Sequence, residues 1–402
     1  MRMLFYPCIA IPVFAIHAAL PAHGEDAEEP QAAVQAVNAF ASDLYGVLAA
    51  QQGNLLYSPY SLSSALGMTY AGAKGETACE MARTLSFAED AALHASFKRL
   101  ETALNESADE CTLEIANALW AQEGYAFLDS YTDLVAQAYD AGLDTLDFES
   151  DPEGARETIN AWVASRTNDL IQDLFPPGAI DPLTRLALAN AVYFKGAWLA
   201  PFDAGLTKDA PFRLADGETV DAKMMQRTGP YRYGETEEAQ VLELPYAGEG
   251  LAMTVVLPRA GRPLADVEQR IADDGLAVFL EAPRRAIEVR VAFPRFKMAA
   301  GFSLAQTLAR MGMPLAFSDA ADFSGMTGRD DLKISAVEHK ACIDVTEEGT
   351  EAAAATGVSM IVKTIAREPK VFRADRPFVF AIRDRASGAV LFLGRVMDPR
   401  GD

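Results

Sequence analysis

The chain alternates between segments of helical and of strand-like hydrophobic periodicity, which predicts a mixed fold. Between residues 31 and 50 the apolar positions recur at helical spacing. Residues 186–194 instead form an almost continuous apolar run, typical of a buried strand, and the one Asn190 inside it must find hydrogen-bond partners. The same reasoning predicts helices at 62–71, 91–104, 130–141, 155–169 and 303–311, strands at 54–59, 113–121, 240–246, 251–258, 287–293 and 334–345, and a hairpin of 378–383 and 389–396.

One boundary is marked by a local signal. Ser58 stands directly before Pro59, which predicts a capping serine followed by proline at the first helical position. The sequence contains no repeat and no low-complexity linker, so one mixed helix-and-sheet domain is expected.

A run of small residues near the C-terminus stands apart from this pattern. Residues 347–364 read EEGTEAAAATGVSMIVKT. In a strand, the even positions from Thr350 to Met360 would form an uncharged face that could lie against a core, and the odd positions would tolerate water. Four successive alanines and Gly357 weaken a strand, so the segment need not be one at rest. From composition alone, a helix or a solvated linker is the alternative.

Composition and charge exclude several classes of function. The 402 residues are 50% hydrophobic, which predicts a globular protein with a large core. With 35 basic and 57 acidic residues the net charge is −22, which argues against a nucleic-acid or general polyanion partner.

The N-terminus reads as a signal peptide. Arg2 precedes a mostly apolar stretch at residues 4–20, and the small residues Ala22 and Gly24 follow. Cleavage near Gly24 is expected, with cleavage after Ala22 as the alternative, leaving a single domain at 25–402. A membrane anchor is the competing interpretation, but the run is shorter than the roughly 20 apolar residues of a span and contains two prolines. Secretion is therefore expected, to the extracellular space or to the periplasm of a bacterium.

The remaining candidate chemistry is sparse. His94, expected to be solvated, and His339 are the histidines beyond the N-terminal segment, and no G-x-S-x-G or H-E-x-x-H motif or metal-ligand spacing occurs. No enzyme activity, cofactor or metal is expected. A disulfide between Cys79 and Cys111 is left open, and Cys342 is expected to be a buried thiol. Asn105 begins a glycosylation sequon.

Several separate blocks resemble the serpins, a family of protease inhibitors that act by a large conformational change. The hinge-like segment EEGTEAAAAT at 347–356 carries the resemblance most clearly. It is joined, in the family's order, by NLLYSPYS at 54–61, LANAVYFKGAW at 188–198, HKA at 339–341, DRPF at 375–378 and LGRV at 393–396. The resemblance covers residues 31–399 and implies a mixed α/β (multi-domain-type α+β) fold, with three sheets, eight or nine helices and an exposed reactive-centre loop at about 349–371.

The resemblance also implies roles for individual residues. Ser58, Ser61, Asn190 and His339 match a cluster under the centre of the large sheet, where strands must part. Trp198 and Glu347 match the top of that sheet, and Arg295 is expected to pair with Glu347. The hinge would comprise Glu347, Glu348, Gly349, Thr350, Glu351, Ala352, Ala353, Ala354, Ala355 and Thr356.

The family's spacing implies the position of the reactive bond. The bond usually falls sixteen residues after the glutamate that opens the hinge, which places it at Lys363–Thr364, and the fifteen residues from Lys363 to Phe378 agree with the family's loop length. Arg367 is the rival basic residue. Lysine at this position selects trypsin-like serine proteases, whose specificity pocket carries an aspartate.

The expected function is inhibition of a trypsin-like protease by a monomeric suicide substrate that is cut and then traps the acyl-enzyme. The small, uncharged core-facing hinge positions favour inhibition over the alternative of a non-inhibitory carrier, storage or structural serpin. A secreted hydrolase, the other alternative, finds no support in the motifs.

Overall fold

A computed structural model of the chain describes residues 30–88, 92–108, 110–139, 142–350 and 368–401. The predicted signal peptide and the reactive bond therefore lie outside the described residues, as do hinge residues 351–356. The beginning of the hinge, at 347–350, lies inside them.

The described residues contain ten α-helices, two of them only one turn long. The helices are α1 (Gln31–Leu48), α2 (Pro59–Gly72), α3 (Gly75–Leu85), α4 (Ala92–Ser107), α5 (Asp129–Tyr139), α6 (Pro152–Arg166), α7 (Leu264–Asp274), α8 (Ala277–Leu280), α9 (Ala305–Met311) and α10 (Ser324–Thr327). Short 3-10 helices occur at Ala204–Leu206 and Leu315–Phe317.

Fifteen strands form two hydrogen-bonded sheets within the described residues. The six-stranded sheet has the order β10-β11-β12-β4-β2-β3, and the nine-stranded sheet has the path β1-β15-β14-β8-β7-β6-β9-β13 with β5 paired to β6. The strands are β1 (Leu55–Tyr57), β2 (Cys111–Gln122), β3 (Gly142–Leu146), β4 (Leu186–Ala197), β5 (Lys208–Arg213), β6 (Thr219–Glu235), β7 (Ala239–Pro245), β8 (Leu251–Pro258), β9 (Arg285–Pro294), β10 (Phe296–Ser303), β11 (Ala336–Val345), β12 (Gly349–Thr350), β13 (Lys370–Arg373), β14 (Phe378–Asp384) and β15 (Val390–Val396).

The expected number of three sheets is corrected to two in the described part of the chain, because one long strand joins two of them. β6 spans 17 residues and pairs along its length with β5, β9 and β7. Arg232 pairs with both Ala286 of β9 and Glu243 of β7, so the ladder continues without a break. The helix count is ten instead of eight or nine because the one-turn helices α8 and α10 are included.

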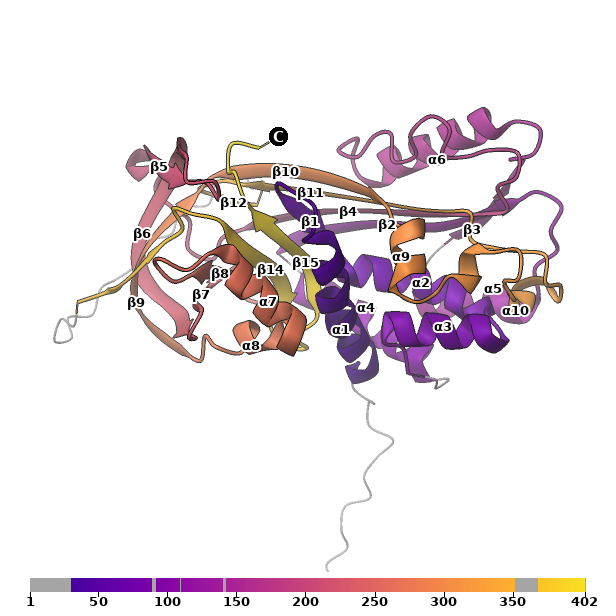
Figure 1. Cartoon of the computed structure of the whole chain (residues 1–402), viewed down its shortest axis with the longest axis horizontal. Coiled ribbons are helices and arrows are strands. Elements are labelled where there is room, and N and C mark those ends of the chain that lie inside the picture. The colour runs from indigo at the N-terminus through magenta and orange to yellow at the C-terminus, as the bar shows by residue number, and fades with distance from the viewer. Residues whose placement is uncertain (1–29, 89–91, 109, 140–141, 351–367, 402) are drawn as a thin grey trace, which may run out of the picture.

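Local sequence explains the start of α2. Ser58 is its N-cap and accepts a hydrogen bond from the Ser61 amide at 3.1 Å, with Pro59 at the first helical position, as predicted. The helix runs into the main core, which lies between the two sheets and the helices α1 to α5. Figure 1 shows these helices on one side of the six-stranded sheet and α6 alone on the other.

A second, smaller core lies between α6 and the outer face of the six-stranded sheet. The sheet side of this core is formed mostly by alanines, whereas α6 and the segment after it contribute large apolar residues such as Ile159, Val163 and Phe175. The alanines are Ala116 and Ala118 on β2, Ala187, Ala189 and Ala191 on β4, and Ala336 on β11. This alanine face lets α6 lie close to the strands.

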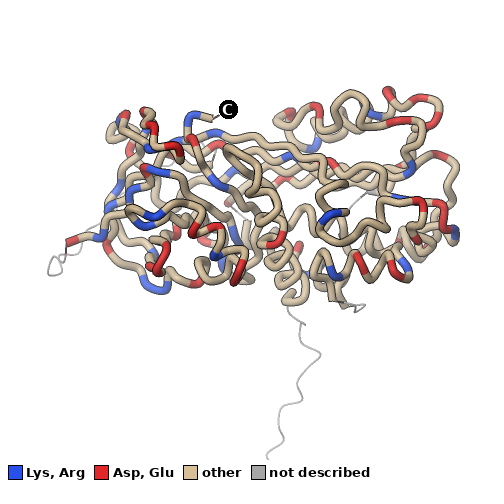
Figure 2. The backbone as a smooth tube through the Cα atoms, in the orientation of Figure 1, with Lys and Arg blue, Asp and Glu red and all other residues tan. Residues whose placement is uncertain are grey.

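Basic and acidic residues are interspersed along the backbone in the view of Figure 2, and acidic residues are in excess in the sequence. None of the described helices is long and apolar enough to cross a bilayer. Likewise, the described residues contain no cluster of histidine, cysteine and carboxylate side chains that could hold a metal ion.

Candidate functional site

The beginning of the hinge is already a strand of the six-stranded sheet. β11 and β4 pair in parallel from Ala336 and Ala187 up to Cys342 and Tyr193. Beyond that point they separate, and the two-residue strand β12 lies between them, antiparallel to both. The sheet is thus closed along most of its length and open at one end.

Thr350, the second residue of β12, is held on the core face of the sheet. It pairs with Val345 on one side and Gly196 on the other, and it is fully buried. Its hydroxyl lies 2.9 Å from the hydroxyl of Tyr246, so each satisfies the other in the core. The prediction that even hinge positions face the core therefore holds at the described position 350.

Only glycine fits at position 349. Gly349 has φ +151°, in a region that side-chain-bearing residues rarely adopt. A Cβ atom there would lie 2.1 Å from the carbonyl oxygen of Gly196 and 2.6 Å from Cα of Ala197. The backbone of β4 thus leaves no room for a side chain at position 349.

Glu347 anchors the chain just before β12. Its carboxylate accepts a hydrogen bond from the Thr207 hydroxyl at 2.7 Å and lies 3.5 Å from Nε of Arg295, the expected ion-pair partner. Its backbone carbonyl accepts from the Phe202 amide at 2.8 Å. Glu347 is buried, whereas the Arg295 side chain is 47% exposed, so this ion pair is of the weak surface kind. Glu348 is exposed.

Trp198 packs under the same turn. Its indole Nε1 donates to the Thr346 carbonyl at 3.0 Å, and its backbone amide donates to the Glu348 carbonyl at 2.9 Å. Its ring stacks on Tyr246 with centroids 4.6 Å apart and the planes within 13°. One aromatic pair thus contacts both the turn before β12 and, through Tyr246, Thr350 itself.

The predicted polar cluster under the centre of the sheet is assembled by the fold. Nε2 of His339 accepts a hydrogen bond from the Ser58 amide at 3.1 Å, so the proton of the neutral ring is on Nδ1. Nδ1 in turn donates to Oδ1 of Asn190, whose amide nitrogen donates to the Ser61 hydroxyl at 2.7 Å. Burial lowers the pKa of His339 to about 3, which keeps the ring neutral. The network joins α2, β4 and β11.

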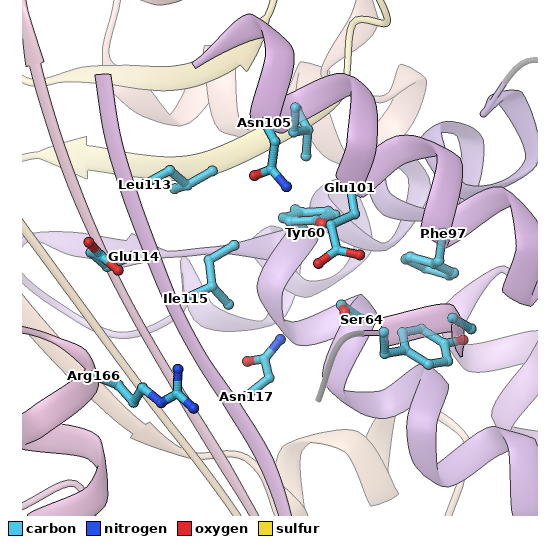
Figure 3. Close-up of a pocket in the computed structure, with 13 residues that line it drawn as sticks. Tyr60, Ser64, Phe97, Glu101, Asn105, Leu113, Glu114, Ile115, Asn117 and Arg166 are labelled. Carbon is cyan, nitrogen blue, oxygen red and sulfur yellow. The ribbon is translucent and has the colours of Figure 1, made fainter. Parts of the chain in front are cut away.

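Sequence reasoning missed a further member of this network. Asn117 of β2 accepts hydrogen bonds from the Ser61 hydroxyl, at 3.1 Å, and from the amide of Asn190. It also borders a cavity of about 240 Å³ between β2 and the helices α2, α4 and α5. Figure 3 shows Asn117 pointing toward this space, with Tyr60 and Glu101 across from it. An asparagine inside an apolar strand, the signal that identified Asn190, would have found Asn117 as well.

One expectation about a single residue is wrong, and a second holds in part. His94 is not solvated, because its Nδ1 lies 2.6 Å from the Tyr139 hydroxyl in an aromatic cluster, and burial lowers its pKa. Cys342 is a thiol packed against the smaller core, as expected, but it is half-buried instead of fully buried. The disulfide left open by the sequence is not formed, since Cys79 and Cys111 are both free thiols.

The predicted hinge residues Glu351, Ala352, Ala353, Ala354, Ala355 and Thr356, and the predicted reactive bond Lys363–Thr364, lie outside the described residues. What the described site presents is a strand end seated in an opening sheet, above a polar network that joins the two strands on either side of the opening. Further residues of the chain could enter this opening between β11 and β4 and extend the hydrogen-bonded ladder of β12.

A family model described as Serpin (serine protease inhibitor) matches residues 35–399. Leukocyte elastase inhibitor of Bos taurus is 42% identical over 369 residues, covering 90% of this chain and 97% of the relative. An uncharacterized serpin-like protein of Thermococcus kodakarensis is 40% identical over 380 residues, covering 94% and 87%.

Solved structures agree with these sequence matches. Serpin48, described as a highly specific serpin of the insect Tenebrio molitor, superposes with a TM-score of 0.82 at 34% identity, covering 94% of this chain and all of that one. Uncleaved ovalbumin gives 0.80 at 30% identity, covering 92% and 100%. The native stressed conformation of Arabidopsis AtSerpin1 gives 0.82 at 29% identity, covering 93% and 99%.

Proposed function

The chain belongs to the serpin family, and from this premise we propose that it inhibits trypsin-like serine proteases as a suicide substrate cut at Lys363–Thr364. Serpins are protease inhibitors and not enzymes, and several of the relatives are named as inhibitors. The fold is the serpin fold. The inhibitory mechanism, the reactive bond and the target class are the proposal.

The observation that carries the proposal is the position of β12 between β11 and β4. If the chain after Thr350 continues in the register of β12, residues 351–360 would pair with β4 down to its first residue, Leu186. The even positions would then face the core. They are Ala352, Ala354, Thr356, Val358 and Met360, without charge or proline.

The same register predicts how the polar network would accommodate the new strand. Position 356 would fall between His339 and Asn190, which now pair directly across β11 and β4. Thr356 would bring a hydroxyl that both donates and accepts, so it could bond to His339 on one side and Asn190 on the other. The network would be rearranged instead of being left unsatisfied.

The chemistry follows from the lysine. The protease serine attacks the Lys363 carbonyl carbon, an ester to Lys363 forms, the bond to Thr364 breaks, and the amine of Thr364 leaves with the proton delivered by the protease histidine. The chain from Gly349 to Lys363 is then free at its far end and can enter the sheet.

Insertion would move the protease a long way and release enough free energy to hold it. At about 3.3 Å per residue, the thirteen residues from Thr350 to Lys363 would carry the ester roughly 43 Å along the sheet. Ten residues of new ladder, at about 0.5–1.5 kcal/mol per hydrogen bond, supply on the order of 10 kcal/mol, and burial of Val358 and Met360 adds roughly 1.5–3 kcal/mol each. Displacing one oxyanion donor slows deacylation by about 10²–10³.

The lysine supports trypsin-like targets over elastase-like ones. A trypsin-like pocket carries an aspartate that pairs with lysine, whereas an elastase pocket is small. Relatives of this chain are named for leukocyte elastase, so a protease of that type is the rival target.

The decisive experiment is incubation with trypsin followed by denaturing electrophoresis and N-terminal sequencing of the released peptide. A denaturant-resistant complex and a peptide that starts at Thr364 support the proposal. The control Lys363→Ala should lose the complex with trypsin, and Thr350→Arg should be cut as an ordinary substrate because the charge cannot enter the core. Complete cleavage of the unaltered chain with active trypsin left over would favour a carrier, storage or structural role, and a complex retained by Thr350→Arg would refute the insertion account.

We also propose that the protein acts as a secreted monomer, with residues 1–24 as signal peptide and 25–402 as the mature domain. The N-terminal sequence of the protein recovered outside the producing cell tests the cleavage site. Recovery of the uncleaved chain inside the cell would refute it.

A further inference from the structure

β11 carries two neighbouring titratable side chains that are both buried. Glu338 is 6% exposed and His339 is 1% exposed. Because successive side chains of a strand point to opposite faces, His339 lies on the core face and Glu338 on the face covered by α6. Both residues belong to the stretch of β11 that pairs with β4, opposite Ala189 and Asn190.

The surroundings of His339 favour the neutral ring. The Ser58 amide and Asn190 occupy its two nitrogens, and the Phe302 ring lies parallel to it at 6.5 Å. Protonation of Nε2 would remove the acceptor of the Ser58 amide. Burial therefore lowers the pKa of His339 to about 3, from an ordinary value near 6.5.

The surroundings of Glu338 favour the protonated carboxyl. Across the strands it faces Ala189 of β4 and Ser303 of β10, whose hydroxyl is its polar neighbour. Burial raises the pKa of Glu338 to about 7, and the Ser303 hydroxyl opposes this shift in part.

The charged groups on the α6 side of the sheet are engaged elsewhere. Lys340 of β11 donates to the Gln172 carbonyl at 2.7 Å. Arg156 of α6 pairs with Glu153 and donates to the Phe175 carbonyl. Arg185, directly before β4, donates to the Pro182 and Thr184 carbonyls. Among the described residues, none of these cations is within ion-pair distance of Glu338.

The two residues respond to acid in opposite directions. The pKa of His339 is lower in the folded chain, so the unfolded chain takes up the proton first. Acidification from pH about 7.5 to about 5 therefore raises the equilibrium constant for unfolding, on the order of thirtyfold. The pKa of Glu338 is higher in the folded chain, so the folded chain takes up the proton first. The same acidification then favours the folded state, by at least about tenfold.

We propose that Glu338 and His339 form an opposed pair of proton-binding groups that keeps the stability of the folded sheet at β11 and β4 nearly independent of pH between neutral and mildly acidic solution. Each group alone would make the sheet sensitive to pH in this interval. Together, on the two faces of one strand, they offset each other. This balance is a property of the intact protein and does not depend on whether a protease is trapped.

The test compares the unfolding equilibrium in urea at pH about 5 and about 7.5. The proteins are the unaltered chain, Glu338→Gln, His339→Gln and the control Glu288→Gln, which removes an exposed carboxylate from β9. All other titrating groups are shared, so only differences between variants count. On acidification, the equilibrium constant for unfolding of Glu338→Gln should rise at least tenfold more than that of the unaltered chain. The constant of His339→Gln should deviate in the opposite direction. The constant of Glu288→Gln should change as it does in the unaltered chain.

An acid response of Glu338→Gln equal to that of the unaltered chain would overturn the proposal. If His339→Gln does not fold, amide hydrogen exchange along residues 336–345 decides with Glu338→Gln alone. After correction for intrinsic exchange, protection of these amides in Glu338→Gln should fall with acid at least tenfold more than in the unaltered chain, and equal protection would refute the pairing.

Discussion

Replacing Gly349 by alanine tests whether the hinge must enter the sheet where β12 now lies. The added Cβ would lie 2.1 Å from the Gly196 carbonyl oxygen, a backbone atom of β4 that cannot move without breaking its own ladder. The positive φ of Gly349 adds strain for any other residue. We therefore expect β12 to leave the sheet in Gly349→Ala and to be unable to return.

The free-energy cost can be worked from the bonds that β12 makes. Leaving the sheet breaks the 2.7 Å bond from the Thr346 amide to the Gly349 carbonyl and the 2.9 Å contact between Thr350 and Tyr246, together with the pairing of Thr350 with its two neighbours. At about 0.5–1.5 kcal/mol for each hydrogen bond, the intact protein should lose about 2–4 kcal/mol of stability. It should still fold, because the two hydrophobic cores do not involve Gly349.

Two assays report the outcome. Trp198 contacts the turn before β12, so with Trp120→Phe and Trp162→Phe as background its emission should shift to longer wavelength in Gly349→Ala. With trypsin, the variant should be cut at the reactive bond and should form little denaturant-resistant complex, since the cleaved loop cannot begin its ladder.

The matched control is Gly217→Ala. Gly217 also has positive φ, +91°, but a Cβ there meets no atom within 4 Å. It therefore measures the cost of backbone strain alone, about 1–2 kcal/mol, with no effect expected on complex formation. A Gly349→Ala protein that forms complexes in the same proportion as Gly217→Ala refutes the requirement for entry at β12.

Three further substitutions probe the same region and the core. Tyr246→Phe leaves the buried hydroxyl of Thr350 without a partner and should lower the free energy of unfolding by about 1–3 kcal/mol in urea titrations. Arg295→Ala should change the free energy of unfolding by less than about 1 kcal/mol, because Arg295 is half exposed and the Glu347 carboxylate keeps its hydrogen bond from the Thr207 hydroxyl. A larger loss would show that the ion pair is stronger than its geometry suggests. Arg395→Ala should cost about 3–5 kcal/mol in the same titration, because it leaves Glu268 and three backbone carbonyls without their buried cation, and a loss below 1 kcal/mol would contradict this.

Periodicity predicted the elements whose environment is uniform along their length. β4 is apolar apart from Asn190 and Lys195, and β11 is apolar on its core face apart from His339. Both strands lie within a few residues of their predicted ends, as does the C-terminal hairpin. β6 was not predicted, because it is mostly polar on its exposed face and contains Gly229 and Pro230 in its middle. That dipeptide usually signals a turn, whereas here it lies inside a strand that pairs with β9 on both sides of it.

The candidate site, like the fold, could be predicted only in part from the sequence. The residues of the polar network could be named from the resemblance, and the hydrogen bonds that join them follow the predicted buried role of Asn190. The sequence could not show which side chains from distant strands contact one another. The contact of Thr350 with Tyr246 joins residues 104 positions apart, and Asn117 enters the network only because β2 pairs with β4 in one register.

The alanine face beneath α6 has a mechanical consequence if the sheet widens as the proposed insertion requires. Over β4 this helix rests on methyl groups, whereas at β2 it is held by Trp120, whose ring packs edge-to-face against Trp162 of α6 with centroids 5.8 Å apart. In the register of β12, an entering strand would place Ala353, Ala355 and Gly357 against α6 and so add further small residues to this face. Resistance to widening would then come from both faces: on the α6 side from the bond of Lys340 to the Gln172 carbonyl, and on the core side from the amide, hydroxyl and imidazole groups that join β4, β11 and α2.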